Sequence, residues 1–553
     1  MSLSRRSFIL SAGAVTGARA LIPGAGRAPE DQSPSPGSKK LLIYNEAGWE
    51  LGQRNTSPMS VRDVERNGVD KVAGTGVRIY QLGLLTGNVA AMHRSRILDP
   101  YASTLKEPYK IHMWRLLQNI RALAEQGTDF LEVVINRCRQ VGIEPHASFR
   151  VNDPHHTYKN TQRNRPGLGK VKYTHEYLYP DLRSPWIDAN PQLWLPDGGF
   201  DFSHEEVRAR KLAVLRELLD NYDIDGLELD FTRIPPFFRD GEKQKGEGLM
   251  TAWVEQVRQL VDAKGRHRGR PLRLTVRVEF DPEVNRAEGL DVESWVRKGL
   301  VEIVCLGVIG DATPDAPADW FIQLCRGTGC LVCPSLEGFF YWVGDALGAV
   351  RTTSVENARA AAATYFLAGA DGLQMFNFCA VDKPWEHRIV EELADPDRFA
   401  FADKHYVFTL WPGALECLRD PWLSKLVLYN DEEQASLTVR LGDDFERARS
   451  FGVGPVGKLK LQVDALNRKD DLLISWNGVP CSPRPESQNQ FAWDSFSVDV
   501  VYFDVPNEAL RKGDNVLQIK RQRRLAGFEG LIEFQSCELE VVYPREVPSS
   551  RLI

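Results

Sequence analysis

The chain has 553 residues, of which 43% are hydrophobic and 26% are charged, and its formal net charge is −6. This composition is that of a globular protein with a large core, and the length exceeds that of one ordinary domain. The slightly acidic balance gives no reason to expect a nucleic acid or an anionic membrane surface as a partner. A barrel of about 250–400 residues with a smaller second module fits this length.

The first residues have the pattern of an export signal. Ser4 to Leu10, with the pair Arg5-Arg6, resembles the twin-arginine motif, and Ala18-Arg19-Ala20 is typical of a cleavage site. We therefore expect a signal peptide over 1–20, followed by a disordered linker rich in Pro, Gly and Ser over 21–38. The apolar part is too short for a membrane span. The resemblance implies a periplasmic or secreted protein that is exported in its folded state.

From about residue 40 to residue 390, strand-like runs alternate with amphipathic, helix-like runs. Strands are predicted over 41–46, 77–83, 143–150, 226–232, 274–280, 301–308, 331–337 and 372–378. Helices are predicted over 112–125, 128–141, 204–220, 247–264 and 354–368. Alternating β and α elements predict a parallel sheet, and eight such strands predict a closed (β/α)₈ TIM barrel over 39–398.

Beyond residue 400 the helix-like runs stop and short strand-like runs recur between turns. They cover 425–429, 435–440, 458–464, 471–476, 496–504, 515–520 and 531–543. This spacing predicts a β-sandwich over 399–553. The turn Ser475 to Gly478 and the segment Leu510 to Leu517 resemble the jelly-roll accessory domains of glycosidases, which implies that this part binds sugar or braces the barrel.

Polar residues occupy every second position of four predicted barrel strands, and several of them are carboxylates. They are His146, Ser148, Arg150 and Asn152 on the third strand, Glu228, Asp230 and Thr232 on the fourth, Thr275, Arg277 and Glu279 on the fifth, and Glu337 on the seventh. Because side chains alternate across a strand, these groups converge if the strands line one barrel. Glycoside hydrolysis requires one protonated and one ionised carboxyl group, and nearby arginines offset their mutual repulsion.

Two of these strands resemble the signatures of bacterial glycosyl-hydrolase-like barrels, namely Asp225 to Arg233 and Glu144 to Asp153, and the resemblance covers about 40–390. In the broader clan A of retaining glycosidases, the acid/base Glu ends strand four and the nucleophilic Glu ends strand seven. The resemblance implies Glu337 as the nucleophile. Strand four departs from the usual Asn-Glu pair, so the acid/base is Glu228 or Asp230.

We therefore predict an exported glycoside hydrolase that cleaves O-glycosidic bonds of a poly- or oligosaccharide, with no cofactor and no metal. The catalytic candidates are Asp230, Glu337, Glu228 and Glu279. The substrate-binding candidates are His146, Arg150, Asn152, Asp153, His155, Arg233, Arg277 and Asn377, with Asn45 at another strand end. The prediction requires that Asp230 and Glu337 face one accessible pocket at the same rim of the barrel.

Two other functions are open. The first is a non-catalytic carbohydrate-binding protein that kept the barrel and lost one catalytic carboxylate. A buried ion-pair layer with no catalytic role is also open for Glu228 and Arg277. The second is a metal-dependent lyase or isomerase acting on sugar acids, with His155-His156 beside Asp153 as ligands. The cluster Cys325, Cys330 and Cys333 has no obvious fourth zinc ligand, which leaves free buried thiols or one disulfide.

Overall fold

The computed structural model describes residues 39–544 except for short internal segments. The segments not described are 54–56, 85–89, 104–110, 154–161, 166–168, 173–183, 197, 233–234, 309–313, 315, 343–348, 377, 379–383, 410–425, 429–433, 465–471, 486–487, 492–496 and 523–531. The predicted signal peptide and linker lie outside the described residues, as do His155, Arg233 and Asn377.

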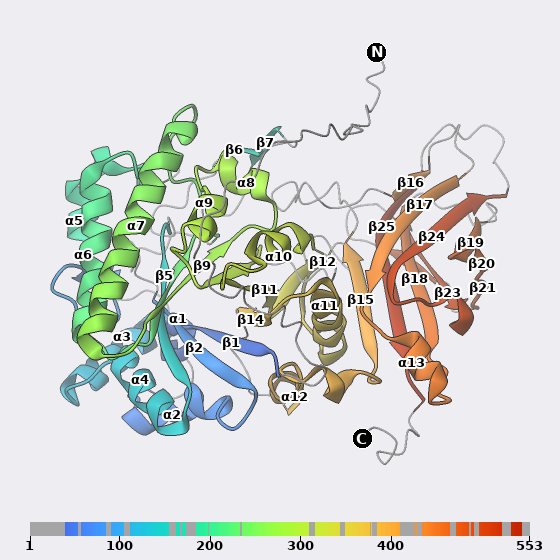
Figure 1. The fold of residues 1–553 in the computed structure, drawn as a ribbon, viewed down its shortest axis with the longest axis horizontal. Helices are drawn as coiled ribbons and strands as arrows, with labels where there is room; N and C mark the ends of the chain where they lie inside the picture. Colours follow the sequence, from blue (N-terminus) through green and yellow to red (C-terminus); the bar gives the residue numbers. More distant parts are fainter. Residues whose placement is uncertain are drawn as a thin grey trace, which may run out of the picture. The chain divides into compact units, whose positions relative to one another are not determined.

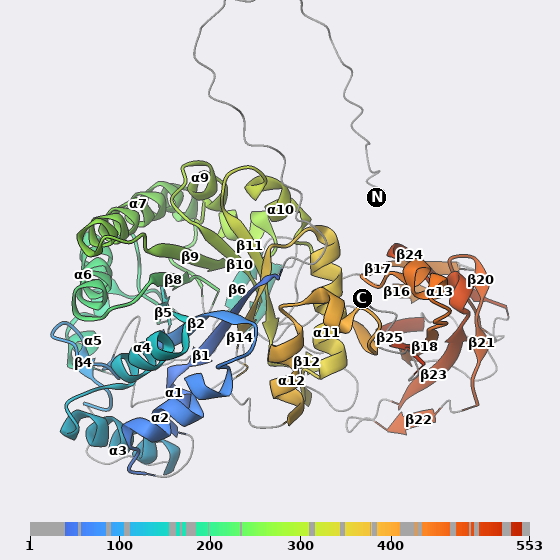
Figure 2. The same ribbon diagram turned by 60° about the horizontal axis from the view of Figure 1, so that its bottom comes forward.

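Eight parallel strands close into a barrel, as the alternating pattern predicts. In spatial order they are β1 (Leu41–Ala47), β14 (Gly372–Phe376), β11 (Leu331–Glu337), β10 (Ile303–Leu306), β9 (Arg273–Val278), β8 (Gly226–Asp230), β5 (Glu144–Arg150) and β2 (Val77–Leu84). Each matches a predicted strand to within a few residues. Figure 2 shows the strands surrounded by the helices that connect them.

The helices described in the barrel region include the five predicted over 112–125, 128–141, 204–220, 247–264 and 354–368, and others that were not predicted. They are α1 (Gly48–Gln53), α2 (Val61–Asn67), α3 (Ile111–Glu125), α4 (Phe130–Val141), α5 (Pro185–Ala189), α6 (Glu205–Asn221), α7 (Lys243–Arg268), α8 (Pro282–Ala287), α9 (Val292–Arg297), α10 (Asp319–Cys325), α11 (Val355–Ala368) and α12 (Pro384–Glu392) (Figure 1). Their ends follow capping rules. The side chain of Ser354 accepts a hydrogen bond from the backbone of Asn357 at the start of α11, and Gly369 ends that helix at φ 105°.

Two barrel strands begin with the same Asp-Gly-Leu triplet, and packing explains the glycine in both. A Cβ on Gly372 would lie 2.2 Å from the backbone oxygen of Leu41 on β1. A Cβ on Gly226 would lie 2.6 Å from the ring of His146 on β5. Both strands therefore approach their neighbours too closely for any larger residue.

The barrel interior changes from apolar to polar along its axis. An apolar cluster fills the end at which the strands begin, made of Ile43, Ile79, Ile303, Cys305 and Cys333. Farther along the same strands, the inward positions carry amides, hydroxyls and charges, all of them buried. The outward positions, such as Leu227, Leu229 and Phe231 on β8, belong to the larger apolar core between strands and helices.

Two antiparallel sheets follow the barrel, consistent with the predicted sandwich. One contains β15 (Lys404–Thr409), β25 (Ile532–Val542), β18 (Val456–Asp464), β23 (Ser497–Val505) and β21 (Ser482–Pro483), with β16 (Leu426–Leu428) and β22 (Gln488–Phe491) paired at its strands. The other contains β17 (Gln434–Leu441), β24 (Gly513–Arg521), β19 (Leu472–Trp476) and β20 (Val479–Pro480), and α13 (Phe445–Ser450) follows β17. A common core with the buried Trp476 joins them. The sequence patterns did not predict β15.

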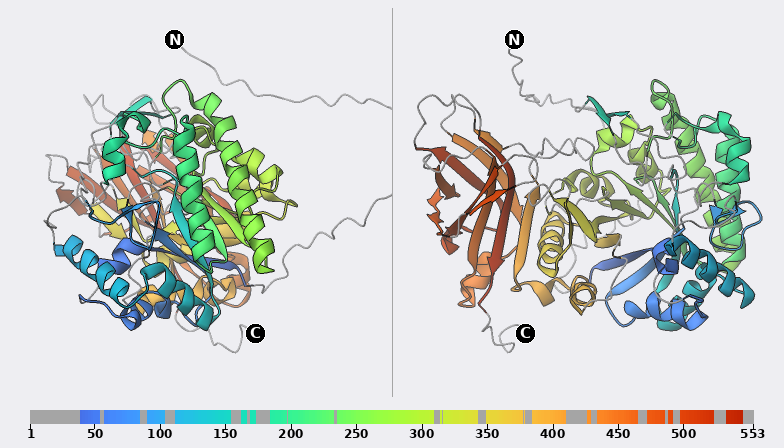
Figure 3. Two further views of the ribbon diagram at one scale, coloured as in Figure 1. Left: turned by 90° about the vertical axis from the view of Figure 1, so that its left-hand side faces the viewer. Right: turned by 180° about the vertical axis from the view of Figure 1, so that it is seen from behind.

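Three two-stranded sheets decorate the barrel: β3 (Ala90–Ala91) with β4 (Asp99–Pro100), β6 (Gln162–Arg165) with β7 (Gly169–Lys172), and β12 (Phe339–Trp342) with β13 (Ala349–Thr352). Helix α11 of the barrel also meets the C-terminal sheets. Asn357 donates a 2.9 Å hydrogen bond to the backbone of His405 on β15, and Arg359 donates one of 3.2 Å to the backbone of Asp403. Figure 3 gives two further views of these elements.

Candidate active site

One arginine inside the barrel binds two carboxylates from other strands. Arg277 on β9 places one terminal nitrogen 3.3 Å from Oδ1 of Asp230 and the other 2.9 Å from Oε1 of Glu337. Asp230 is the last residue of β8 and Glu337 the last residue of β11. Both therefore lie at the carboxyl ends of barrel strands, where TIM-barrel enzymes have their active sites. The structure brings these three side chains together, as their strand positions predict.

A layer of polar side chains lies below this ion triad and holds Glu228. Asn45 donates a 2.9 Å hydrogen bond to Oε2 of Glu228, and the amide of Gln374 donates to Oε1. The same amide donates a 2.7 Å hydrogen bond to Gln81, and Ser335 donates one of 2.6 Å to the Gln374 carbonyl. The layer is hydrogen-bonded across five strands, so its side chains have little freedom to move.

Glu228 is the carboxyl group in this region that holds a proton near neutral pH. Burial, and next the negative charge of Asp230, raise the pKa of Glu228 to about 7, from an ordinary value of 4.5. Two carboxylates that share a low-dielectric site resist ionising together, so the pair retains one proton to higher pH. A general acid in glycoside hydrolysis needs this property.

Asp230 offers one unoccupied carboxylate oxygen. Its Oδ1 accepts hydrogen bonds of 3.0 Å from both the backbone N–H and the hydroxyl of Thr232. Its Oδ2 is buried and has no hydrogen-bond partner among the described residues. Buried carboxylate oxygens are nearly always hydrogen-bonded, so this atom marks a position where a ligand hydroxyl, a proton or water would bind.

The three side chains of the triad have almost no exposed surface, and an accessible pocket at this rim stays a prediction. Asp230 is 1% exposed, and Arg277 and Glu337 are 0% exposed. Described side chains pack closely around Arg277. The guanidinium of Arg277 occupies the space between the two carboxylates, and the ring of Phe376, the last residue of β14, lies 3.6 Å from its central carbon. Two ion pairs and a cation–π contact stabilise this arrangement.

Arg150, Asn152 and Asp153 follow one another at the end of β5 but have different partners. Arg150 forms a 2.8 Å ion pair with Asp153, and both are buried. Asn152 donates to the backbone of Phe200 at 3.2 Å and of Pro236 at 2.8 Å, and accepts a hydrogen bond from Phe200. The Asn152 amide therefore ties two loops together, and its contact with a sugar stays a prediction. Arg150 lies beside Asp230 in the register of β5 and β8.

Two other candidates, His146 and Glu279, have described contacts with other groups. His146 packs against Gly226 at the start of β8, and its Nε2 lies 3.8 Å from Glu144. In the register of β5 and β8, the level of Ser148 and Glu228 lies between His146 and the strand ends at Arg150 and Asp230. Glu279 follows β9 and is 8% exposed, and its backbone N–H donates to the side chain of Asn285. No described contact joins either residue to Arg277.

Three predicted substrate-binding residues and the predicted cysteine cluster remain. Arg233, His155 and Asn377 lie outside the described residues. Among the residues described, no three or more His, Cys, Asp or Glu side chains gather as metal ligands. Cys325, Cys330 and Cys333 are buried free thiols.

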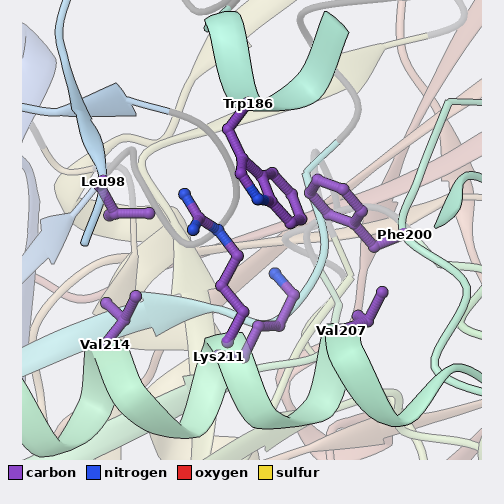
Figure 4. A pocket seen from close by; sticks show the side chains of 7 residues that line it. Leu98, Trp186, Phe200, Val207, Lys211 and Val214 are labelled. Carbon is purple, nitrogen blue, oxygen red and sulfur yellow. The ribbon is translucent and has the colours of Figure 1, made fainter. Parts of the chain in front are cut away.

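A small cavity behind β5 has the aromatic character of a sugar site but not the size (Figure 4). Its volume is about 10 Å³, and it is lined by Leu98, Trp186, Phe200, Val207, Arg210, Lys211 and Val214. The guanidinium of Arg210 covers one face of the Trp186 ring at 3.8 Å. Burial lowers the pKa of Lys211 well below its usual value, which Asp153 partly opposes. The space holds about one water molecule.

Sequence reasoning missed Gln81, Gln374, Ser335 and Phe376. Gln81 and Gln374 occupy inward positions of β2 and β14, two residues along from Ile79 and Gly372. The alternation of these strands could have identified them. Neutral amides and a phenylalanine nevertheless do not by themselves indicate a catalytic site, whereas carboxylates at inward positions do.

Comparisons with known proteins give distant similarities only. No protein-family model matches the sequence. A curated relative, an S-layer-related protein of Niallia circulans, is 23% identical over 252 residues, which cover 41% of this chain and 14% of that protein. The chain thus spans about a seventh of the length of the curated relative it matches.

The solved structures that are similar include carbohydrate-active enzymes. The glycoside hydrolase domain of PgaB (BpsB) from Bordetella bronchiseptica is 12% identical, with a TM-score of 0.37, over 64% of this chain and 99% of that one. Chitinase ChiW from Paenibacillus sp. str. FPU-7 is 10% identical, with a TM-score of 0.38, over 90% of this chain and 56% of that one. At these identities and TM-scores, no activity is inferred from them. No described helix has the length and hydropathy of a membrane span.

Proposed function

We propose that this chain is an exported glycoside hydrolase that cleaves O-glycosidic bonds of a poly- or oligosaccharide. The observation that carries the proposal is the binding of Asp230 and Glu337, from strands β8 and β11, to one guanidinium at the carboxyl ends of the barrel strands. Two carboxyl groups facing a common point are the requirement of both retaining and inverting hydrolysis.

In the proposed retaining reaction, Glu337 attacks the anomeric carbon as the bond to the leaving oxygen breaks. The proton held by the Glu228–Asp230 pair passes to that oxygen through Oδ2 of Asp230, which has no hydrogen-bond partner among the described residues. Water then attacks the glycosyl ester, returns a proton to Asp230 and releases Glu337. Arg277 holds both carboxylates in place and offsets their mutual repulsion.

Glu228 supports the acid role of Asp230. With a pKa near 7, it keeps one proton within the Glu228–Asp230 pair at neutral pH. Asn45 and Gln374 occupy both of its oxygens, so Glu228 acts on the substrate through Asp230 and does not contact it. This assigns the acid/base function to the pair, with Asp230 as the group that meets the sugar.

The burial of the triad favours a second candidate, a carbohydrate-binding barrel without catalysis. Hydrolysis requires that the substrate displace the Phe376 ring and the side chains around it, because Asp230 and Glu337 have almost no exposed surface. A barrel in which Arg277, Asp230 and Glu337 only stabilise the fold needs no such movement.

The test is release of reducing ends by the purified full-length chain from a panel of polysaccharides, with and without a chelator. The proposal expects hydrolysis of at least one polysaccharide, unaffected by the chelator. Binding of a polysaccharide without any hydrolysis favours the second candidate. Activity that disappears with the chelator supports the metal-dependent alternative, and periplasmic recovery that depends on Arg5 and Arg6 tests export.

A further inference from the structure

A second cavity, separate from the ion triad, lies where helix α11 meets the C-terminal sheets. Its volume is about 230 Å³. It is lined by Ala363, Phe366, Leu367, Pro396, Asp397, Phe399, Ala400, Phe401, Lys404, Gly442, Asp443, Asp444, Arg447 and Lys512. We call it the junction pocket. Pockets for drug-sized ligands have volumes of about 300–1,000 Å³, so the junction pocket is smaller and suits about one or two sugar rings.

The back of the junction pocket is rigid. Gly442 packs directly on α11, since a Cβ there would lie 2.2 Å from the backbone of Ala363. Next to it, the buried Lys404 forms a 2.7 Å ion pair with Asp443, which also accepts a 2.6 Å hydrogen bond from the hydroxyl of Tyr543. Lys404 donates further to the backbone oxygens of Phe399, Ala400 and Ala402. A pocket with such fixed walls loses little entropy when it binds a ligand.

The rim of the pocket is polar and open to solvent. Arg447 lies 3.5 Å from Asp397, with side chains 45% and 58% exposed. Lys512 lies 3.3 Å from Asp444, with side chains 45% and 40% exposed. Exposed ion pairs of this kind contribute little to stability, so ligand hydroxyls can replace one partner at low cost. Because both signs of charge are present and balanced, the rim suits a neutral ligand rich in hydroxyl groups.

Aromatic rings complete the lining. Phe366 and Phe401 are half-buried, and the buried Phe399 lies below them. The guanidinium of Arg447 lies over the Phe401 ring at 5.5 Å, so that charged and aromatic groups meet at one point of the rim. Aromatic rings pack against the C–H faces of pyranoses, while charged side chains accept and donate hydrogen bonds to their hydroxyls.

We propose that the junction pocket is a non-catalytic binding site for a neutral saccharide. It is remote from the triad, because Ala363, Phe366 and Leu367 lie in the last turns of α11, which lead to the amino end of β14. Phe376, which covers Arg277, is at the other end of that strand. The pocket therefore anchors a glycan independently of hydrolysis, and it uses groups from both the barrel and the sandwich.

The test is calorimetric titration of the full chain that carries Asp230→Asn and Glu337→Gln, which prevent turnover. The ligands are three neutral hexasaccharides: β-1,4-linked glucose, α-1,4-linked glucose and β-1,4-linked N-acetylglucosamine. In that background we expect at least one hexasaccharide to bind. The added pair Arg447→Ala and Lys512→Ala weakens that binding at least tenfold. Arg484→Ala is the matched control, since Arg484 pairs with Asp504 on β23, in the C-terminal sheets but outside the pocket.

Binding that is equal in the presence and absence of the Arg447 and Lys512 substitutions overturns the proposal, as does a failure of all three hexasaccharides to bind. The melting temperature of each variant verifies that it is folded. The result is independent of the proposed hydrolase. A parent chain that cleaves nothing, yet binds a hexasaccharide through Arg447 and Lys512, leaves the junction pocket in place and contradicts only the proposed catalysis.

Discussion

The raised pKa of Glu228 makes the stability of the barrel depend on pH in a definite direction. In the folded chain Glu228 holds its proton up to about pH 7, whereas in the unfolded chain the proton leaves near pH 4.5. Between these values the folded state binds one proton more than the unfolded state, so stability falls as pH rises. The contribution is fully present below pH 4.5 and is lost as pH rises through about 7.

The size of the effect follows from the interval between the two pKa values. One pH unit is worth about 1.4 kcal/mol, which gives about 3 kcal/mol over the whole interval. For a barrel of roughly 350 residues, this corresponds to about 4 °C in melting temperature. Glu228→Gln removes the ionisation but keeps the shape of the side chain, so it should abolish this contribution to the pH dependence.

Thermal melts of the parent and of Glu228→Gln between pH 4.5 and 7.5 measure the effect. The parent should lose stability relative to the variant by about 3 kcal/mol across this range. Glu255→Gln on α7 is the control, because Glu255 is a surface carboxylate paired with Lys298. Parallel pH profiles for the parent and Glu228→Gln would refute the reasoning.

Other substitutions test the packing around the site. Arg277→Met removes the guanidinium that binds both buried carboxylates, and we expect a loss of about 3–5 kcal/mol in denaturant unfolding; an unchanged midpoint would contradict the ion triad. Gly372→Ala forces a Cβ against the backbone of Leu41 and should destabilise the barrel by about 1–3 kcal/mol in the same assay. Gly248 lies in α7 with open space around it, so Gly248→Ala should instead stabilise the barrel by about 0.5–1 kcal/mol. Equal effects of the two glycine substitutions would contradict the close approach of β14 to β1 as the reason for Gly372.

Much of the fold follows from local patterns along the chain. The eight barrel strands are apolar runs bounded by turn residues, and the helices between them have clear amphipathic spacing and good caps. Strand β15 was missed because Lys404 and His405 interrupt its apolar pattern; the partner of Lys404, Asp443, is 39 positions away.

The candidate site was predictable in part. Asp230, Arg277 and Glu337 converge because parallel strands place alternate side chains in one interior. Charged residues at inward positions of a strand are also easy to recognise in a sequence. The binding of both carboxylates by one guanidinium depends on the register between neighbouring barrel strands. This register cannot be read from a single sequence. The covering of the site by Phe376 depends on the same register.

The most direct test of the central claim compares the parent with Asp230→Asn and Glu337→Gln on a polysaccharide that the parent hydrolyses. Glu217→Gln is the matched control, a buried carboxylate outside the barrel interior that binds Ser95 and Arg96. Each triad substitution should lower the rate by about 10²–10⁴-fold in a folded protein, and the control should keep the parental rate. Hydrolysis by either triad variant at the parental rate would contradict the assignment of Asp230 and Glu337 as the working carboxylates.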